Sequence, residues 1–337
     1  MNRAKITQVA QRLQTEITDP RNVGRESYLA PAQQLYQWMV QPVEEVLKAK
    51  KIDTILFCTG PGLRALPMAA LHDGQQFLVE KYSPVRIPAF NLINLSQTNL
   101  KQARVLAMGA SEFAQQTPLP AVPVELETIV QSNNLATQQP TPIVANQWPG
   151  RSFLNQSFTL NNLTAQVASD DFGIVHLATH AEFQPGAPEN SYIQLWDEKL
   201  RLDQVNQIGW DNPPMELLVL SACRTAIGDR EVELGFAGLA LYSGVKSALA
   251  SLWYVSDTGT LALMSEFYQQ LRTAPTKSAA LQKAQIAMLS GKVRVEKGEL
   301  LSSRGEVALP PDLAGSSTTN LSHPFYWAGF NLIGTPW

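Results

Sequence analysis

Short apolar runs that stop at polar residues recur in the second half of the chain and predict buried strands. The clearest are residues 173–180 (GIVHLATH) and 217–226 (LLVLSACRTA), which end at a histidine and at a cysteine followed by arginine. Uninterrupted apolar runs of this length are typical of parallel strands buried on both faces. Amphipathic helical patterns follow at 258–271 and 277–289. Strands that alternate with helices predict an α/β fold, a mostly parallel sheet with helices on both faces.

The first half of the chain predicts shorter elements of the same kinds. Residues 1–30 carry a helical pattern that Asp19 and Pro20 end, so we expect a helical extension there. We expect 133–150 to be a surface connection and 302–322 to be a long polar loop. The other expected elements are a helix at 31–50 broken at Pro42, a strand at 52–58, a hairpin of 76–80 with 84–87, a strand at 104–108, helices at 124–131, 161–168 and 236–242, a hairpin over 192–205, and strands at 247–254 and 325–333.

Composition excludes several classes of protein and partner. The chain has 337 residues, 45% of them hydrophobic and 16% charged. Its net charge of −3 gives no electrostatic reason to expect a nucleic-acid or membrane-surface partner. Its longest weakly charged run, 235–255, contains Gly244 and Lys246 and predicts a helix followed by a strand rather than a membrane span. Two cysteines, Cys58 and Cys223, and the lack of a signal segment predict a soluble protein in a reducing, cytoplasmic compartment.

Two of the expected strand ends carry candidate chemistry. Open α/β sheets bind ligands outside the carboxyl ends of their strands, which is where Cys223 and His180 fall. A cysteine acts as a nucleophile in the thiolate form, and a nearby imidazole favours that form and can protonate a leaving amine. An unpaired cysteine is as often buried and inert, so these residues alone leave both roles open for Cys223. Cys58 ends a strand with no matching histidine run, which favours a structural role.

The four histidines do not indicate a metal site. His176 and His180 have the HxxxH spacing of zinc proteases, but Leu177 replaces the glutamate that follows the first histidine in that motif. On a strand, four residues span about 13 Å, too far for one ion to bind both rings. We therefore expect His176 to support the sheet or the site, and His72 and His323 to be structural or exposed.

Two further motifs have competing interpretations. Residues 60–65 (GPGLRA) match a dinucleotide-binding fingerprint, but Pro67 would disrupt the helix that such a site needs, so a Gly/Pro turn is the better prediction. Asp257 follows the apolar residues 251–255 and precedes the expected helix 258–271. It can serve as the N-cap of that helix, or as a carboxylate at the same rim as Cys223, where it could bind a guanidinium.

With His180, Cys223 and Asp257 considered together, the chain resembles a CHAT domain, in the clan of cysteine peptidases that includes caspases and separase. The resemblance covers about residue 31 to the end and implies a caspase-like α/β fold, with 1–30 as an extension, 31–337 as the CHAT domain, 31–160 as its N-terminal half and 161–337 as its catalytic half. The segments that carry it are 175–183 (VHLATHAEF), 220–226 (LSACRTA), 251–257 (SLWYVSD) and 323–334 (HPFYWAGFNLIG), with further matches in 56–70, 78–88 and 105–113.

The resemblance implies a cysteine endopeptidase that uses a Cys–His dyad and neither metal nor cofactor. Cys223 would attack the peptide carbonyl and His180 would transfer protons. The backbone N–H groups of Cys223 and Ala181 would hold the oxyanion, although caspases have glycine where this chain has Ala181. Separase has a segment similar to LWxVxD whose aspartate receives an arginine at P1, so Asp257 implies limited proteolysis after Arg or Lys.

The resemblance also implies partners. The substrate would be a protein, and the charged loop 224–233 after the nucleophile is a place for activation or self-cleavage, with Arg230 as one site. Many members of the family carry TPR arrays or other sensors; none is seen in this chain, so we expect activation by a separate activator or sensor protein, by a ligand, or by a region outside this sequence. We expect the protein in a bacterial cytoplasm. Two alternatives stay open: a non-catalytic scaffold with the same fold, and an acyl hydrolase or transferase with the same dyad.

Overall fold

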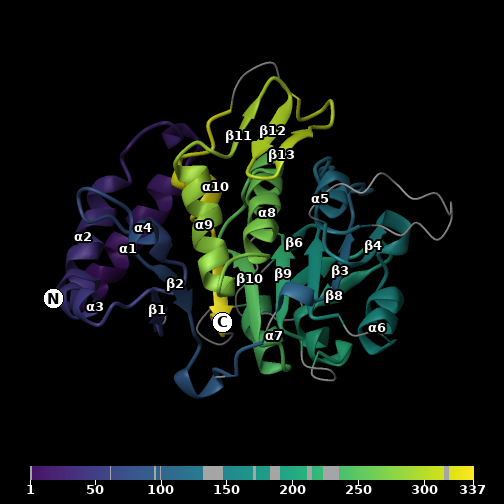
Figure 1. Ribbon diagram of the computed structural model, residues 1–337, viewed down its shortest axis with the longest axis horizontal. Helices are drawn as coiled ribbons and strands as arrows, with labels where there is room; N and C mark the ends of the chain where they lie inside the picture. Colours follow the sequence, from purple (N-terminus) through teal and green to yellow (C-terminus); the bar gives the residue numbers. More distant parts are fainter. Residues whose placement is uncertain are drawn as a thin grey trace.

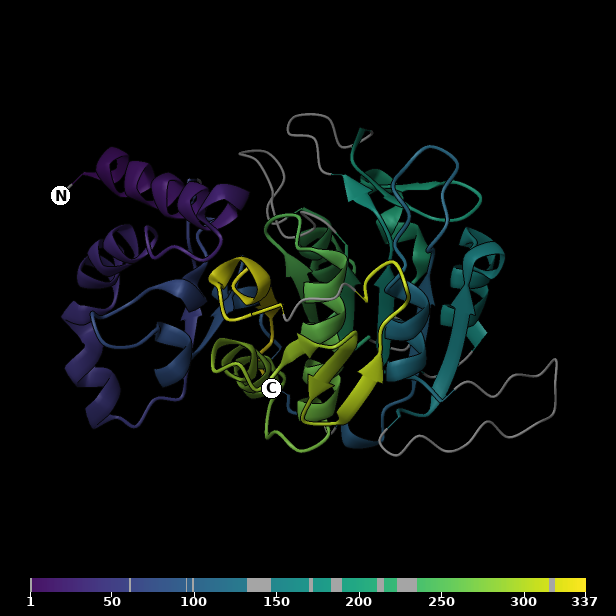
Figure 2. The same ribbon diagram turned by 90° about the horizontal axis from the view of Figure 1, so that it is seen from above.

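The computed structural model describes residues 2–60, 62–94, 96–98, 100–131, 147–169, 172–182, 190–210, 215–222, 235–314 and 319–337. Its centre is an eight-stranded sheet in the order β1, β2, β14, β10, β9, β5, β3, β4 (Figure 1, Figure 2). The bounds of these strands are β1 Thr54–Phe57, β2 Ser83–Arg86, β3 Val105–Gly109, β4 Gly150–Leu154, β5 Ile174–Ala178, β9 Leu217–Ser221, β10 Ser247–Ser251 and β14 Phe330–Gly334.

The sheet is mostly parallel, as predicted. Its neighbouring strands pair in parallel except β10 and β14, which are antiparallel. Every residue of β3, β5, β9, β10 and β14 is buried, which explains why their sequences lack polar alternation. Strands from both expected halves, 31–160 and 161–337, enter this sheet and share one hydrophobic core.

Helices cover both faces of the sheet, as predicted. Helix α8 packs beside both α5 and α9, whereas α6 and α7 both contact the 3-10 segment η8. The bounds are α5 Val122–Ile129, α6 Leu160–Ser169, α7 Gly235–Tyr242, α8 Asp257–Leu271, α9 Lys277–Leu289 and η8 Leu202–Ile208. Shorter 3-10 turns lie at Pro20–Asn22, Gln41–Val43, Met68–Ala70, Phe90–Leu92, Leu100–Gln102 and Asn155–Ser157.

The N-terminal helices lie together at one end of the molecule, drawn in purple in Figure 1. Helix α1 (Arg3–Thr18) ends at Asp19, and Ala10, Leu13 and Ile17 form its buried face. The predicted break at Pro42 is confirmed, because α2 (Leu29–Met39) is followed by a 3-10 turn that holds Pro42 and then by α3 (Glu44–Ala49). Helix α1 contacts both α2 and α10 (Pro324–Trp327), so the extension packs against the end of the chain.

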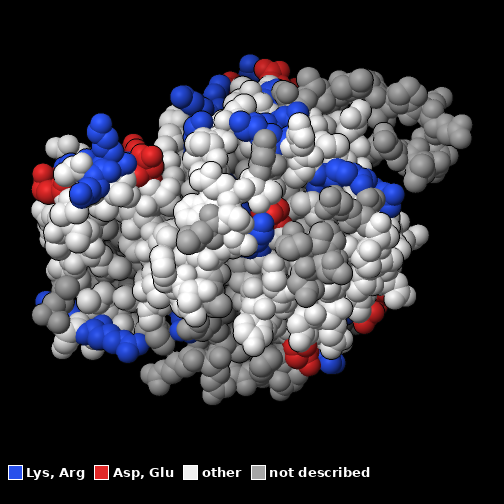
Figure 3. Space-filling model, turned by 60° about the horizontal axis from the view of Figure 1, so that its bottom comes forward, with Lys and Arg blue, Asp and Glu red and all other residues white. Residues whose placement is uncertain are grey.

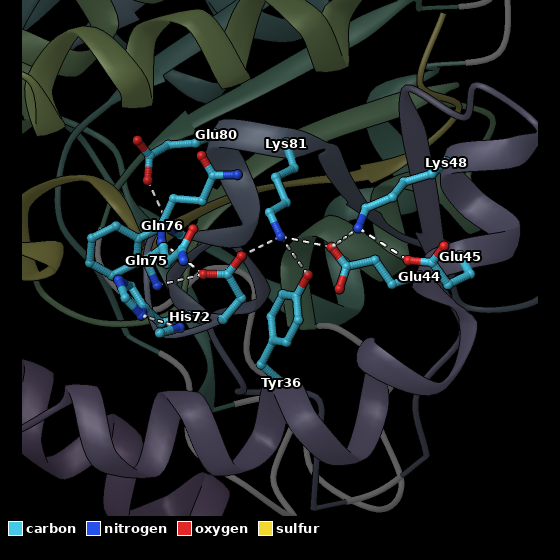
Figure 4. A network of polar contacts seen from close by, with 12 residues as sticks. Tyr36, Glu44, Glu45, Lys48, His72, Gln75, Gln76, Glu80 and Lys81 are labelled. Atoms are coloured by element: carbon cyan, nitrogen blue, oxygen red, sulfur yellow. Dashed lines mark hydrogen bonds and ion pairs between the residues drawn. The ribbon is translucent and has the colours of Figure 1, made fainter.

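A polar cluster around Lys81 joins α2 and α3 to α4 (Leu78–Lys81), the short helix before β2 (Figure 4). The Lys81 ammonium donates to Glu44 Oε1 at 2.7 Å and to the Tyr36 hydroxyl at 3.1 Å, and it forms an ion pair with Asp73. The Lys81 side chain is only 15% exposed. Burial alone would raise the pKa of Asp73, but hydrogen bonds from Lys81 and from the backbone of Gln75 and Gln76 outweigh it and lower that pKa to about 2.

The hairpin predicted for 76–87 is wrong. The structure has a short helix there, α4 (Leu78–Lys81), and then strand β2, which pairs in parallel with β1. The helix begins where Glu80 Oε2 accepts the backbone N–H of Phe77 at 2.6 Å, a helix-start contact that outweighs the strand preference of the local sequence. Because parallel neighbours need a crossover, α4 and the turns before it supply the connection that a hairpin would not need.

Three other predictions in the first and last parts of the chain need correction. The polar loop 302–322 is partly sheet, because β12 (Glu299–Ser302) and β13 (Gly305–Ala308) pair as a hairpin beside β11 (Arg294–Glu296). The final strand begins only at Phe330, because α10 occupies Pro324–Trp327. The connection 133–150 lies mostly outside the described residues, but Gly150 already begins strand β4.

The hairpin predicted for 192–205 is confirmed in its first part. Strands β7 (Tyr192–Gln194) and β8 (Lys199–Arg201) pair antiparallel, and β6 (Ala181–Glu182) adds a third strand next to β7. The end of the expected second strand is instead the start of η8. This small sheet directly follows β5, so it extends the region where β5 ends.

Candidate active site

A pocket lies at the carboxyl ends of three central strands. Thr179 follows β5, Ser221 and Ala222 end β9, and Ser251 ends β10; all four line the pocket. The other lining residues come from the segment before α5, from α5 and α8, from the segment before α8, and from β14: Leu119, Val122, Glu125, Tyr254, Val255, Asp257, Thr260 and Phe330. The cavity holds about 30 Å³ accessible to water, room for one or two water molecules. Its position is the one where open α/β folds bind ligands.

His180 lies two residues beyond β5 and is half-buried, and its ring contacts Thr117 and Phe113. Its Nε2 lies 2.7 Å from the backbone oxygen of Thr117, and the ring of Phe113 packs against it with centroids 4.6 Å apart. A carbonyl oxygen can only accept, so Nε2 carries a proton in this contact. The lone pair of the neutral ring is then on Nδ1, which makes Nδ1 the basic nitrogen.

Asp257 is the first residue of α8, and its carboxylate lines the pocket. The N-cap interpretation of Asp257 is wrong, because the N-cap is Ser256, whose hydroxyl accepts the backbone N–H of Gly259 at 3.2 Å. Asp257 Oδ2 instead accepts the backbone N–H of Ala121 at 2.8 Å. Burial, with a further contribution from the negative charge of Glu125, raises the pKa of Asp257 to about 6 although the Ala121 N–H opposes the shift.

The segment between β3 and α5, residues 111–121, contacts both of these side chains. Thr117 supplies the carbonyl at His180, and Ala121 supplies the N–H at Asp257. Within the segment, the backbone N–H of Leu119 donates a hydrogen bond to the Ser111 carbonyl at 2.9 Å. Both contacts to the site are backbone groups, so residue types in this segment carry no signal for them; its sequence shows only that Pro118 and Pro120 favour a loop.

Cys223 lies outside the described residues, as does the loop 224–233 with Arg230. The described chain reaches Ala222, whose carbonyl accepts the hydroxyl of Ser251 at 2.7 Å. Ala181 begins β6, where it pairs with Ile193 of β7. The pairing of Cys223 with His180 and the oxyanion role of Ala181 and Cys223 therefore stay predictions.

The remaining candidates have structural surroundings. His176 is fully buried in β5. His72 Nδ1 accepts the Gly74 N–H at 2.9 Å, and His323 caps α10 through the Phe325 N–H. Cys58 is exposed, with Sγ 3.5 Å from the carbonyl of Pro88.

The Gly60–Ala65 segment forms a turn, as predicted. The backbone N–H of Leu63 donates to the Gly60 carbonyl at 3.2 Å, and Gly62 has a φ of 92°. Among the described residues around this turn, no helix begins where its N-terminus could bind a pyrophosphate.

The described ranges also contain no group of three or more His, Cys, Asp or Glu side chains arranged to hold a metal ion. Within the same ranges, every helix is too short or too polar to cross a membrane.

Comparisons with known proteins agree with the fold. The sequence model of the CHAT domain matches residues 29–335. No curated protein matches the sequence. Among solved structures, the fold is similar to the complex of RgpB pro- and mature domains from Porphyromonas gingivalis, with a TM-score of 0.53 and 11% identity over 97% of this chain and 71% of that one.

Two further structures share the fold. One is the separase–securin complex of Saccharomyces cerevisiae, with a TM-score of 0.52 and 13% identity over 89% of this chain but only 17% of that one. The other is gingipain R, an Arg-specific cysteine proteinase, with a TM-score of 0.51 and 11% identity over 91% of this chain and 67% of that one. At these identities the likeness shows a caspase-like fold and no more. The match of the family model over residues 29–335 establishes that the chain belongs to the CHAT domain family.

Proposed function

We propose that the protein is a cysteine endopeptidase that cuts protein partners after Arg or Lys. The observation that carries the proposal is His180, whose ring is oriented by the Thr117 carbonyl beside the strand end that leads to Cys223. A backbone acceptor on Nε2 fixes the tautomer with Nδ1 as base, which is the state that a general base needs. The family and the caspase-like fold support the same chemistry.

The reaction has two steps in this proposal. The Cys223 thiolate attacks the carbonyl carbon of the scissile bond, forming a C–S bond and an oxyanion held by the N–H groups of Ala181 and Cys223. The C–N bond then breaks as the protonated His180 gives its proton to the leaving amine. In the second step His180 takes a proton from water, and the resulting hydroxide attacks the thioester carbonyl. The C–S bond breaks, the acid leaves, and the Cys223 thiolate and the protonated His180 are restored.

Asp257 is the proposed receiver of the P1 cation. Its carboxylate lies at the wall of the pocket, and charge-assisted hydrogen bonds to a carboxylate favour a guanidinium or ammonium over a neutral side chain. The hydrogen bond from the Ala121 N–H to Asp257 Oδ2 ties the 111–121 segment to α8 and orients the carboxylate that would bind the cation.

The first test is hydrolysis of an internally quenched peptide with a single arginine at P1. We expect turnover by the wild type, loss of at least about a thousandfold in Cys223→Ala, and loss of roughly a hundredfold in Asp257→Ala, in line with removing a nucleophile and a buried charge partner. Equal turnover by wild type and Cys223→Ala would exclude the cysteine mechanism. A scaffold with this fold would give no turnover in any variant, and unchanged arginine preference in Asp257→Ala would exclude only the pocket assignment.

A further inference from the structure

A buried polar network lies under the pocket and has no part in the proposed reaction. Glu125 on α5 is 1% exposed and His176 on β5 is 0% exposed. Nε2 of His176 lies 3.0 Å from Glu125 Oε1, although the ring N–H is not well aligned with that oxygen. The same Oε1 accepts the hydroxyl of Ser221 at 2.7 Å. On its other side, the His176 Nδ1 is 3.2 Å from the hydroxyl of Tyr268 on α8.

The network holds the Glu125 carboxylate in one place. Burial raises the pKa of Tyr268 well above its ordinary value, so this hydroxyl keeps its proton and can donate it to Nδ1. With Nδ1 as acceptor, Nε2 is the nitrogen that bears the ring proton, and it faces Glu125. Three elements, β5, β9 and α8, therefore fix the position of one side chain from α5.

Burying such a network in a core costs free energy of desolvation. Removing a carboxylate and an imidazole from water costs free energy that their contact only partly returns, and apolar residues of similar size commonly give equal stability. Stability alone therefore does not account for Glu125. Its position does suggest another role, because Glu125 lines the same pocket as Asp257.

The pocket is acidic on its described walls. Of the described residues that line it, Glu125 and Asp257 are carboxylic acids, and none is lysine, arginine or histidine. The two acids come from different elements, α5 and the start of α8. Their repulsion is visible in Asp257, where the charge of Glu125 adds to the effect of burial in raising the pKa. A cation placed between them relieves that repulsion, whereas a neutral side chain does not.

We propose that Glu125 is a second specificity-determining residue of this pocket, which acts with Asp257 to select a cationic side chain and is held in position by His176 and Ser221. The identity of the substrate in this inference rests on the proposed function, whereas the acidic character of the pocket does not. It goes beyond the assignment of Asp257, because it adds a second carboxylate, from α5, to the lining of the same pocket.

The test compares Glu125→Gln with Glu127→Gln, a matched variant whose side chain is exposed on the same helix. The two substrates are peptides with arginine or with citrulline at P1, since citrulline has the shape of arginine without its charge. We expect Glu125→Gln to lower the arginine-to-citrulline ratio of kcat/KM by at least about tenfold, as for loss of one close charge partner, and Glu127→Gln to leave it unchanged. Glu125→Asp, which keeps the charge, should retain most of the discrimination.

Binding gives a readout that does not need catalysis. We expect wild-type protein to bind benzamidine more tightly than neutral benzamide in calorimetry, and Glu125→Gln to lose most of that difference. If Glu125→Gln does not fold, the double variant Glu125→Gln with His176→Gln keeps an acceptor for Ser221 and removes the charge, and the same losses are expected from it.

The outcomes separate the two proposals. Cleavage after arginine with the same arginine-to-citrulline ratio in Glu125→Gln as in Glu127→Gln would overturn the role of Glu125 and leave the peptidase in place. Benzamidine binding that depends on Glu125, without cleavage of any peptide, would uphold the pocket and overturn the peptidase. A wild type that neither cleaves the peptides nor prefers benzamidine would overturn both.

Discussion

The proposed role of Asp257 in binding a substrate cation would come at a cost to the stability of the resting fold. Its carboxylate is partly buried next to Glu125, and its pKa is about 6 instead of the ordinary 3.8. A carboxyl group whose pKa is raised by folding favours the folded state while protonated. That contribution is fully present below pH 3.8 and is lost as the pH rises through 6. At neutral pH the ionised group therefore weakens the fold that it equips for binding a cation.

Asp257→Asn should consequently be more stable than wild type at pH 8. An asparagine can still accept the Ala121 N–H, and it removes a charge that burial disfavours. After allowance for solvent at this partly exposed site, we expect a gain of about 1 kcal/mol, or roughly 2 °C in Tm. The gain should shrink as the pH falls from 7 towards 4. Thermal unfolding at pH 4, 6 and 8 measures this, and a difference that does not change with pH would refute the assignment.

At the scale of residues, the sequence indicated the candidate residues whose side chains have characteristic chemistry. It did not indicate the residues that contact the site through backbone atoms or through packing of distant elements. His180 and Asp257 could be named as candidates because each follows an apolar strand segment. Thr117 and Ala121 act through backbone atoms, which any residue could provide. Glu125 sits in an ordinary helical pattern, and only the packing of α5 against β3 and α8 brings it beside His176 and Ser221.

At the scale of elements, the Lys81 cluster fastens α2, α3 and α4 to one another (Figure 4). Two carboxylates, Glu44 and Asp73, share this one ammonium. The lowered pKa of Asp73 means that its stabilising contribution is present above pH 3.8 and is lost as the pH falls towards 2. Acid should therefore loosen this end of the molecule.

Lys81→Met should destabilise the protein by about 2–4 kcal/mol, since it leaves two partly buried carboxylates without their cation. The matched control is Lys48→Met. Lys48 also pairs with Glu44, but its side chain is 57% exposed, so we expect nearly wild-type stability. Urea unfolding at pH 7 compares the two. Equal effects of both substitutions would show that burial of the cluster is unimportant.

Elements were predicted correctly where the hydrophobic pattern was long. They were predicted incorrectly where a local hydrogen bond or a short turn determined the secondary structure. Strands β5 and β9 and helices α8 and α9 were predicted within a few residues, because their packing matches their periodicity. Helix α4 has four residues and depends on the Glu80 contact with Phe77. Strands β12 and β13 pair across the polar turn at Ser303 and Arg304, which resembled the interior of a loop.

At the scale of the whole molecule, the sheet consists of two parallel blocks that meet at β10 and β14. The last strand of the chain lies between β2 and β10, so the C-terminal residues hold the two blocks together. Alternating patterns predicted a parallel sheet, but strand order depends on long-range pairing that no local pattern records. The pocket lies on the second block, at the ends of β5, β9 and β10, and α5 and α8 close it.

The distribution of surface charge favours recognition of a basic side chain within the pocket rather than attraction at long range. On the face shown in Figure 3 most of the described atoms belong to uncharged residues, and acidic and basic side chains form small separate groups. With a net charge of −3, the molecule has little long-range field to steer a substrate. Selection of a basic side chain would then depend on the pocket itself, which is where Glu125 and Asp257 lie.

The most direct test of the central claim is covalent labelling of Cys223 by a peptidyl chloromethyl ketone that ends in arginine, mapped by mass spectrometry. Cys58, the exposed cysteine of the described chain, serves as the internal control. We expect one adduct at Cys223, lost when free arginine amide competes and slowed at least about a hundredfold in His180→Ala, in line with loss of a general base. Labelling of Cys58 and Cys223 at similar rates, or a rate at Cys223 that His180→Ala leaves unchanged, would contradict the account.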